Sequence, residues 1–534
     1  MEGIWSTLIN QVCSTSRSTA VSVAHADVAR LYSFYYKALR AAECIDGKTT
    51  QSYANRTGTM LSFSILLASL AATAVGQIDF TSCSPTNLTC LKNRTLVDQA
   101  LLETPNYVTT PITNDPFYST PTNFSSVATQ PGQIIKTELL SNVSQYDIPP
   151  GTALSRVMYT SIDNTGALVP ATAAILWPFT PKSFNGSSAY PLVAWSHGTR
   201  GIFRQCAVSN TRDLQYNFRS VFALSSTGYA VVLADYVGLG TDRPFHHLAY
   251  KLHATDVVFA VKAAQTAFPQ LSKQWLSLGH SEGGGVAWAI GERQAVDPLP
   301  GFLGTIAVAP PPFPISNTPP VSNSVFTAFL SFTISNLYGL NLTDVFQPTA
   351  LQALQYVQQI GGCNDAGYAA LATFTADQIY KNTSWVASKP AVQFAKDYSV
   401  GGRALGGPML ILQGSNDTVV GFAGAQLGFN NTCSAQGKNV SVEFVTIVGQ
   451  DHNPSLYASQ RIWLQWIEDR FSGVPNKQGC SISQLASAFA NVQLPERAIW
   501  QYTKPWITTF SSTFLPESLQ ANNLGFVEQP SNAE

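Results

Sequence analysis

The sequence predicts an α/β fold, with a mostly parallel central β-sheet, helices on both of its faces and one helical insertion. Short and almost uninterrupted apolar runs recur along the chain, and segments with helical apolar spacing, such as Ala254 to Phe268, separate them. A serine between glycines follows one of these runs and precedes a helical segment. No fixed-period repeat is present, which argues against a solenoid or a propeller.

The expected strands are apolar runs with turn residues between them. Asn164-Thr165-Gly166 supplies turn chemistry between the first two runs, and helical segments separate most of the later ones. Continuous apolar runs are typical of strands that are buried on both faces of a parallel sheet. The strands are expected at 156–161, 173–179, 191–196, 229–236, 274–278, 304–309, 409–413 and 442–448.

One interval interrupts this alternation, and we expect it to be an inserted helical cap. It lies between a proline-rich entry at 310–312 and Gly401-Gly402, and its helical stretches are at 325–337, 349–360 and 375–384. A cap over the site is the favoured interpretation. The alternative is a packing subdomain without motion, and whether the cap is a mobile lid stays open. The chain then divides into an irregular N-terminal lead-in at 77–150, a first core part at 151–310, the cap at 311–400, a second core part at 401–475 and a C-terminal extension packed on the core at 476–534.

The composition excludes nucleic acid as a partner and favours secretion. Charged residues make up only 11% of the 534 residues and the formal net charge is −1, so the chain has no basic surface for nucleic acid. Polarity comes from Ser, Thr, Asn and Gln instead, and the many N-x-S/T sequons together predict a glycoprotein of the secretory route. The sequons start at Asn55, Asn87, Asn93, Asn123, Asn142, Asn185, Asn341, Asn382, Asn416, Asn430 and Asn439.

An apolar run at 60–76 ends in small residues and is predicted to be a signal peptide. Cleavage after Gly76 makes Gln77 the mature N-terminus of a secreted, extracellular protein. Residues 1–59 resemble no part of a signal peptide, so we interpret them as a disordered upstream extension of the gene model, with Met60 as the real start. The alternative is an internal signal-anchor, but the run is at the low end of the length that crosses a bilayer, and no stable membrane anchor is expected.

The cysteines are compatible with an oxidising compartment. Two of the eight precede Gln77, so six, an even number, remain after cleavage. Six cysteines allow many pairings, and the residues alone leave the connectivity open. No C-x-x-C spacing and no histidine cluster accompanies them, so we expect no metal site and no cofactor. The cysteines are Cys13, Cys44, Cys83, Cys90, Cys206, Cys363, Cys433 and Cys480.

The segment Gly279-His280-Ser281-Glu282-Gly283 has the G-x-S-x-G pattern of a nucleophile elbow. A serine hydroxyl is a weak nucleophile unless a sharp turn exposes it beside a base. The flanking glycines are needed because strand and helix backbones approach too closely there to leave room for a Cβ. The alternative is a glycine-rich turn with a capping serine, but the strand before and the helix after favour the elbow.

A serine nucleophile requires a base and an acid that orients the base, and on α/β-hydrolase folds these follow in the order Ser, Asp or Glu, His. His452 is the only histidine after Ser281, so it is the predicted base. Asp417 is the predicted acid, because an apolar strand and a glycine turn deliver it to the carboxyl edge of the sheet. Asp451 is the alternative acid. If Asp417 has this role, the sequon at Asn416 should be unused, because a glycan there would crowd the site.

An oxyanion hole needs two backbone donors, each worth about 3–4 kcal/mol. The N–H of Glu282, directly after the nucleophile, is the first. The second is expected in the loop after an early core strand, from Thr199 or Gly198, with Thr199 preferred. His197 and His280 are candidates for shaping the site, but the favoured interpretation of both is a buried histidine with satisfied hydrogen bonds.

The elbow, Asp235-Tyr236-Val237-Gly238-Leu239-Gly240, the strand before Asp417 and the late His452 together resemble the fungal secretory lipase family of the lipase A type. The resemblance covers about residues 100–500. It implies an α/β-hydrolase fold with a helical cap between nucleophile and acid, hydrolysis of carboxylic esters such as triacylglycerols, and disulfides Cys206–Cys363, Cys433–Cys480 and Cys83–Cys90. The surroundings of Glu282 and Gly285 depart from the family pattern and leave the preferred acyl-chain length open.

The predicted function is therefore a secreted serine ester hydrolase, a lipase or esterase, that acts through an acyl-enzyme without a cofactor. Its expected partner is an ester or lipid substrate at a lipid–water interface, and the protein is expected to be a monomer. An acyltransferase, or an esterase of a secondary metabolite on the same fold, is the alternative. A non-catalytic binding protein of this fold is less favoured, because such relatives usually lack a member of the triad. A serine peptidase is also less favoured, because nothing in this sequence indicates a site for a peptide terminus.

Overall fold

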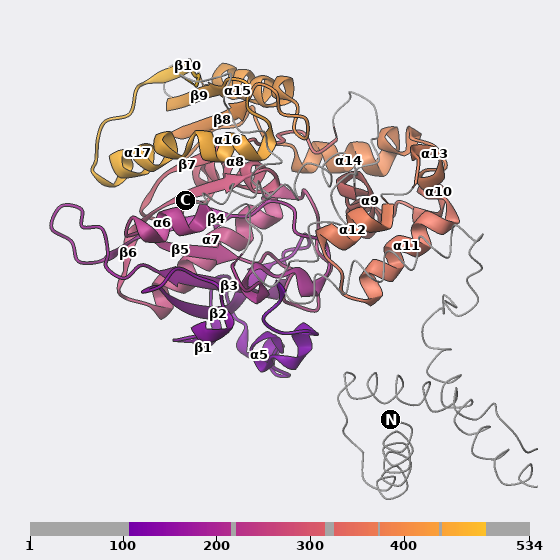
Figure 1. The fold of residues 1–534 in the computed structure, drawn as a ribbon, viewed down its shortest axis with the longest axis horizontal. Coiled ribbons are helices and arrows are strands. Elements are labelled where there is room, and N and C mark those ends of the chain that lie inside the picture. Colours follow the sequence, from indigo (N-terminus) through magenta and orange to yellow (C-terminus); the bar gives the residue numbers. More distant parts are fainter. Residues whose placement is uncertain (1–105, 215–219, 316–324, 372–373, 437–440, 488–534) are drawn as a thin grey trace, which may run out of the picture. The chain divides into compact units, whose positions relative to one another are not determined.

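In the computed structural model, the described part of the chain contributes ten β-strands to one sheet, in the order β1-β2-β3-β5-β4-β6-β7-β8-β9-β10 (Figure 1). The structure describes residues 106–214, 220–315, 325–371, 374–436 and 441–487 of the chain. The predicted signal peptide at 60–76, the segment 1–59 and the pair Cys83–Cys90 lie outside these ranges. The strands are β1 Ile134–Glu138, β2 Ala153–Ile162, β3 Leu168–Trp177, β4 Tyr190–Ser196, β5 Ala230–Ala234, β6 Leu271–His280, β7 Phe302–Val308, β8 Met409–Gly414, β9 Ser441–Ile447 and β10 Gly479–Leu485.

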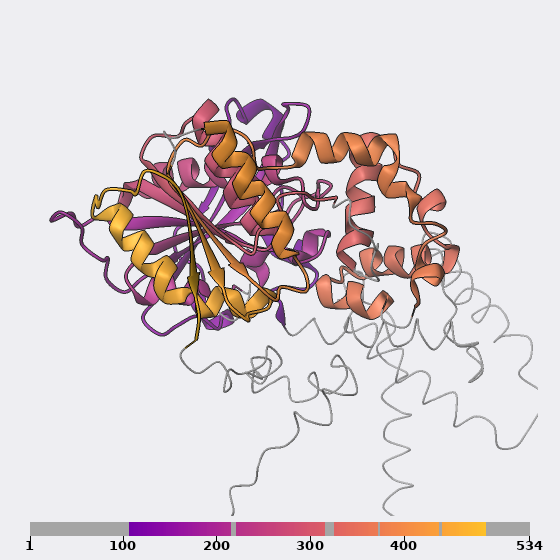
Figure 2. The same ribbon diagram turned by 90° about the horizontal axis from the view of Figure 1, so that it is seen from above.

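The sheet is mostly parallel, as the sequence predicts. Strands β1, β2, β3 and β5 pair antiparallel in succession. Every pairing from β5 through β4 to β10 is parallel. Figure 2 shows the strands as a twisted fan. The carboxyl ends of seven parallel strands therefore meet at one edge, where open α/β sheets bind their ligands.

Both faces of the sheet are buried, which explains the continuous apolar runs. On β4, Leu192 and Ala194 belong to one apolar cluster, whereas Val193 and Trp195 belong to a second cluster on the other face. Successive side chains of a strand point to opposite faces, so one apolar run supplies both clusters. A strand without alternating polar and apolar residues is therefore typical of the centre of the sheet.

Helices cover each face of this sheet (Figure 1). Residues of α7 Tyr250–Ala267, α8 Glu282–Val296 and α15 Phe422–Gln436 belong to the first cluster. Residues of α6 Ser220–Ser226, α16 His452–Ala458 and α17 Gln460–Phe471 belong to the second. A short helix, α5 Phe124–Val127, precedes β1. Among the described residues, no helix combines the length and the apolar character needed to cross a membrane.

Between β7 and β8, the residues that the structure describes form six α-helices, which make up the inserted segment. They are α9 Val325–Tyr338, α10 Leu342–Val345, α11 Pro348–Gln359, α12 Asn364–Leu371, α13 Ala376–Ile379 and α14 Lys389–Tyr398. In both views they lie together beside the strands rather than over a sheet face (Figures 1 and 2). Their apolar side chains, including Phe329 and Phe394, continue the first cluster. The inserted segment therefore shares one core with the sheet.

Three elements differ from the sequence-based expectation. The segment expected to be irregular contains β1, a half-exposed edge strand paired with β2. The helix expected at 375–384 ends at Ile379, because Tyr380 is extended and forms a bridge with Phe346. Strand β10 has a polar, mostly exposed sequence and was not expected, since parallel pairing with β9 rather than an apolar pattern holds it.

Two disulfides between described residues stabilise this framework. Cys433 in α15 is bonded to Cys480 in β10, which ties the edge strand to a helix over the sheet. Cys206, in a short 3-10 helix after β4, is bonded to Cys363, directly before α12. The second bond joins the loop region after β4 to the inserted helices.

Candidate active site

Ser281 lies on a sharp turn between β6 and α8, as the elbow pattern predicts. Its φ of 59° and ψ of −127° are unusual for a residue other than glycine, and its N–H donates to the carbonyl of Val308 at 3.0 Å. A Cβ on Gly279 would lie 2.0 Å from the carbonyl oxygen of Gly283, and a Cβ on Gly283 would lie 1.9 Å from that of Ser196. The turn therefore requires glycine at both positions, for the close approach of strand and helix.

The predicted base and acid are hydrogen-bonded to each other. His452 is the first residue of α16, and its Nδ1 lies 2.9 Å from Oδ2 of Asp417, in the loop after β8. Both side chains are buried. The second oxygen of Asp417 accepts hydrogen bonds from the backbone N–H groups of Val419 and Val420, at 3.0 and 2.7 Å. The carboxylate is thus fixed on both sides, with one oxygen facing the imidazole.

Gln413, at the end of β8, also orients this carboxylate. Its amide Nε2 donates to Asp417 Oδ2 at 3.0 Å, and its side chain is fully buried. The sequence reasoning did not single out Gln413. The signal available in the sequence was a polar amide at the end of an apolar run, four residues before the predicted acid.

Asp451, the alternative acid, has a different place. Its carboxylate accepts hydrogen bonds from the backbone N–H of His452 at 2.7 Å and from the N–H and hydroxyl of Thr418 at 2.8 and 3.0 Å. It caps the N-terminus of α16 and joins the loop of Asp417 to the loop of His452. The structure brings Asp417, and not Asp451, against the imidazole ring.

His280 connects Ser281 to His452. Its Nε2 donates to the backbone carbonyl of His452 at 3.1 Å, and the two ring centroids are 4.7 Å apart. Burial, followed by the positive charge that His452 can carry, holds the pKa of His280 well below its usual range. His280 is therefore a neutral packing partner of His452.

The predicted site residues each follow a parallel strand of the same sheet. Thr199 follows β4, Ser281 follows β6, Asp417 follows β8 and His452 follows β9. They therefore lie at one edge, where the strands end at their carboxyl termini. The hydroxyl of Thr199 donates to Oε2 of Glu282 at 3.0 Å, so the two predicted oxyanion residues are in contact. His197 stacks on Tyr236, and burial lowers the pKa of His197 to about 4.

The carboxylate of Glu282 was not anticipated as a feature of the site. It is 1% exposed and lies beside the histidines His247 and His253. Burial alone would raise its pKa, but His247 and His253 hold the pKa well below its usual range. The available signal was an acidic residue inside a glycine-rich, otherwise apolar segment.

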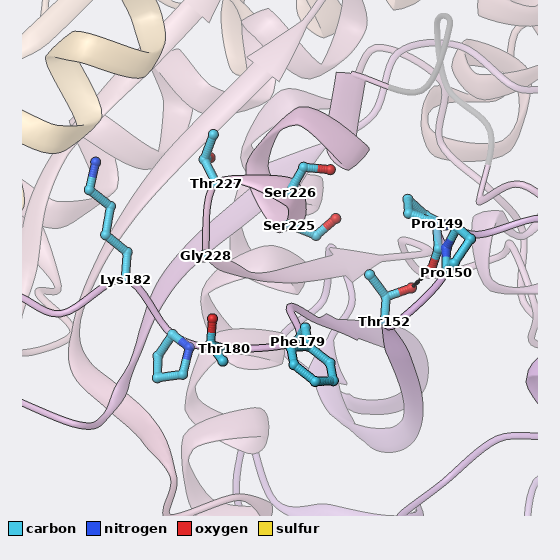
Figure 3. Close-up of a pocket in the computed structure, with 11 residues that line it drawn as sticks. Pro149, Pro150, Thr152, Phe179, Thr180, Lys182, Ser225, Ser226, Thr227 and Gly228 are labelled. Carbon is cyan, nitrogen blue, oxygen red and sulfur yellow. Dashed lines mark hydrogen bonds between the residues drawn. The ribbon is translucent and has the colours of Figure 1, made fainter.

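A surface hollow of about 580 Å³ lies elsewhere on the molecule (Figure 3). Gly228, which lines it, precedes β5, and Phe179 follows β3, which runs antiparallel to β5. The hollow is therefore at the amino ends of the parallel strands, at the edge opposite Ser281. Its walls are formed by Pro149, Pro150, Thr152, Phe179, Thr180, Pro181, Lys182, Ser225, Ser226, Thr227 and Gly228. Within the described ranges no group of three or more His, Cys, Asp or Glu residues is arranged to hold a metal ion.

A sequence model of the secretory lipase family matches residues 204–479, slightly more than half of the 534 residues. The chain belongs to the secretory lipase family. Ser281, Asp417 and His452 lie inside the matched span of this secretory lipase family member, and Thr199 lies just before it. As a family member, the protein is a hydrolase of the lipase and esterase type.

Solved structures of a lipase and of an esterase share the fold of this secretory lipase family member. Candida antarctica lipase A in its closed state matches with a TM-score of 0.54 and 15% identity, over 73% of this chain and 92% of that chain. A ligand-bound form of the rice cell wall degrading esterase LipA from Xanthomonas oryzae matches with a TM-score of 0.50 and 18% identity, over 65% and 98%. A search of curated protein sequences finds no match. At these identities the likeness establishes the fold.

Proposed function

We propose that this protein is a secreted serine hydrolase of carboxylic esters, with Ser281 as nucleophile, His452 as base and Asp417 as the orienting acid. The observation that carries the proposal is the hydrogen bond between His452 Nδ1 and Asp417 Oδ2 at 2.9 Å, at the sheet edge that also bears Ser281. With Nδ1–H donated to the carboxylate, the other ring nitrogen, Nε2, is the one left to accept a proton.

The reaction proceeds in two halves. Ser281 Oγ attacks the ester carbonyl while His452 Nε2 takes the hydroxyl proton, and the tetrahedral intermediate collapses to an acyl-enzyme as His452 returns that proton to the leaving alcohol. A water molecule then attacks the acyl-enzyme with His452 again as base, and the carboxylic acid leaves. Asp417 keeps the ring in the required tautomer and stabilises its charged form.

The oxyanion formed in each half carries a negative charge that backbone donors stabilise. We assign these donors to the N–H groups of Glu282 and Thr199. Glu282 is the first residue of α8, so its N–H points out of the helix N-terminus, where a negative charge is favoured. The contact between the Thr199 hydroxyl and the Glu282 carboxylate at 3.0 Å supports the choice of Thr199 over Gly198.

We assign the inserted helices α9 to α14 the role of a cap that binds the apolar part of the ester. Helix α9 carries Phe326 and Phe329, whose rings lie 6.3 and 6.2 Å from that of His247, a direct neighbour of Glu282. An apolar helix so close to the elbow favours acyl chains over charged substrates.

Secretion is supported by the apolar run at 60–76, by the two disulfides and by the family. The sequon asparagines within the described ranges are all exposed, as glycosylation requires. They are Asn123, Asn142, Asn185, Asn341, Asn382, Asn416 and Asn430. N-terminal sequencing of the secreted protein tests the processing, with Gln77 as the expected first residue and Met1 as the result that refutes it.

Hydrolysis of p-nitrophenyl esters of short and long acyl chains tests the activity, with Ser281→Ala as control. We expect hydrolysis by the wild type and a loss of about 10³-fold or more in the variant. A fluorophosphonate should label the wild type on Ser281 and leave Ser281→Ala unlabelled. An unlabelled wild type without ester hydrolysis overturns the proposal.

A further inference from the structure

The carboxylate of Glu282 joins the two sides of the proposed oxyanion hole. The position after the nucleophile needs only a backbone N–H for catalysis, and any small residue provides it. Here it carries a charged side chain with a relative exposure of 1%. Removing a carboxylate from water costs several kcal/mol, and apolar residues often stabilise a fold equally well. The carboxylate therefore needs an explanation other than stability.

Its hydrogen bonds reach two loops that flank the elbow. Oε2 accepts from the hydroxyl of Thr199 at 3.0 Å, and Thr199 is in the loop after β4. The same oxygen lies 3.0 Å from Nδ1 of His247, and Oε1 accepts from the backbone N–H of Leu248 at 2.7 Å. Leu248 has a φ of 62°, so the segment before α7 adopts a strained backbone conformation where it meets Glu282.

A second charged pair, His253 and Asp256, lies next to Glu282. His253 Nε2 lies 3.5 Å from Glu282 Oε1, and His253 Nδ1 lies 3.8 Å from Asp256 Oδ2. Asp256 is itself held by the N–H of Val237 at 2.9 Å and by the hydroxyl of Ser161. Burial lowers the pKa of His253, but Asp256 and Glu282 outweigh it and raise that pKa to about 9. The carboxylate thus has a positively charged neighbour at neutral pH.

The inserted helices contact this network at two points. Phe326 and Phe329 of α9 lie beside the ring of His247. The backbone N–H of Asn364 in α12 donates to the carbonyl of Arg200 at 2.9 Å, one residue after Thr199. Both loops that Glu282 joins are therefore also fixed by the inserted segment.

We propose that the Glu282 carboxylate is a positioning residue, which holds Thr199 against the first turn of α8 so that the N–H groups of Thr199 and Glu282 face the same oxyanion. The proposal rests on the proposed function and deepens it. Glu282 acts through its side chain on the geometry of the hole, in addition to the N–H that it donates. Loss of the side-chain contacts should weaken binding of the transition state and leave binding of the substrate almost unchanged.

Three variants test this role. Glu282→Gln keeps the shape but removes the negative charge that faces His253 and replaces one accepting oxygen by a donor, so Thr199 can no longer donate to a carboxylate. Thr199→Val removes the hydroxyl without changing the side-chain volume much, and Thr199→Ser retains the hydroxyl. We expect kcat to fall about 10- to 100-fold in Glu282→Gln and Thr199→Val, with KM within about threefold, because removal of a whole donor costs about 10²–10³-fold. Thr199→Ser should restore most of the loss.

The readout that separates positioning from folding is an inhibitor that forms the oxyanion. A trifluoromethyl ketone with the acyl chain of the substrate adds to the serine as a tetrahedral adduct, and its Ki should rise by the factor by which kcat/KM falls. The corresponding trifluoromethyl carbinol forms no adduct, and its Ki should stay within about twofold. Fluorophosphonate titration gives the concentration of active sites, so that kcat is expressed per folded enzyme.

Glu292→Gln is the matched control. Glu292 is a buried glutamate on the same helix, and it accepts from the N–H of Gly401 at 2.7 Å and from Arg403 at 2.9 Å. Its substitution should lower the melting temperature and leave kcat and both Ki values unchanged. Wild-type values of kcat and of the ketone Ki in Glu282→Gln and Thr199→Val overturn the inference. If the wild type itself neither hydrolyses esters nor reacts with the fluorophosphonate, the proposed function fails instead.

Discussion

The imidazole of His280 donates from Nε2 to the backbone carbonyl of His452 at 3.1 Å. The residue that precedes the proposed nucleophile is thus a direct contact of the proposed base. Since burial keeps His280 neutral, it can position His452 without competing for the proton. The elbow therefore positions the proposed base as well as the proposed nucleophile.

We expect His280→Ala to lower kcat about tenfold or more, because His452 loses both a hydrogen bond and a packing partner and small displacements of a catalytic group are costly. His280→Phe separates the two contributions, since it keeps a ring but removes the donor. Steady-state kinetics per titrated active site is the measurement. A kcat within twofold of the wild type in both variants would show that His280 does not position the base.

Substitutions of Asp417 and Asp451 are expected to have contrasting effects on kcat and on stability. Asp417→Asn removes the charge that orients His452 Nδ1, and kcat should fall about 10³- to 10⁴-fold with little change in melting temperature. Asp451→Asn weakens a helix cap and the contact to Thr418, so it should cost about 1 kcal/mol of stability and less than tenfold in kcat. Kinetics and thermal unfolding of both variants decide between the two aspartates, and the reverse pattern assigns the role of the acid to Asp451.

The charge on His253 predicts a pH dependence of stability. Its pKa is raised from 6.5 to about 9 in the folded protein. The stabilisation is complete below pH 6.5 and is lost as the pH rises through about 9. Each tenfold difference in proton affinity between the folded and the unfolded state corresponds to about 1.4 kcal/mol, so the loss amounts to ~3 kcal/mol. Denaturant unfolding at pH 6 and pH 9.5 should show this extra loss in the wild type relative to His253→Gln. Equal losses in the two proteins contradict the assignment.

Local patterns were sufficient for the elbow and the central sheet. Gly279 and Gly283 are required by backbone contacts within a few residues of Ser281 and against the neighbouring strand, so their spacing alone predicts the turn. The buried strands could be recognised because burial on both faces demands a continuous apolar run. The order of Ser281, Asp417 and His452 along the chain follows from the order of the strands that carry them.

The network around Glu282 could not be predicted, because its members come from separate elements. Thr199, His247 and His253 are distant in the sequence from Glu282, and no periodicity relates them. Strand β10 was missed for a related reason, since its position depends on pairing with β9 and on the Cys433–Cys480 bond rather than on its own polar sequence. Gln413 likewise acquires its role only once Asp417 folds back onto it.

The sequon at Asn416 lies next to the proposed active site, so we expect it to be unglycosylated in the secreted protein. Asn416 is exposed, but its backbone N–H donates to the carbonyl of Gln450 at 3.0 Å, and the hydroxyl of its sequon residue Thr418 donates to Asp451. A glycan on Asn416 would stand next to Asp417 and strain the contacts between the two loops. We therefore expect glycopeptide mass spectrometry of the active secreted protein to find glycans at exposed sites such as Asn142 and Asn382, and an unmodified Asn416. Asn416→Gln should be secreted in normal amounts and retain its ester hydrolysis, since no glycan is lost. High glycan occupancy of Asn416 in the fraction that reacts with a fluorophosphonate would contradict this placement of Asp417. A bulky glycan there should disrupt the contacts between the loop of Asp417 and the loop of His452.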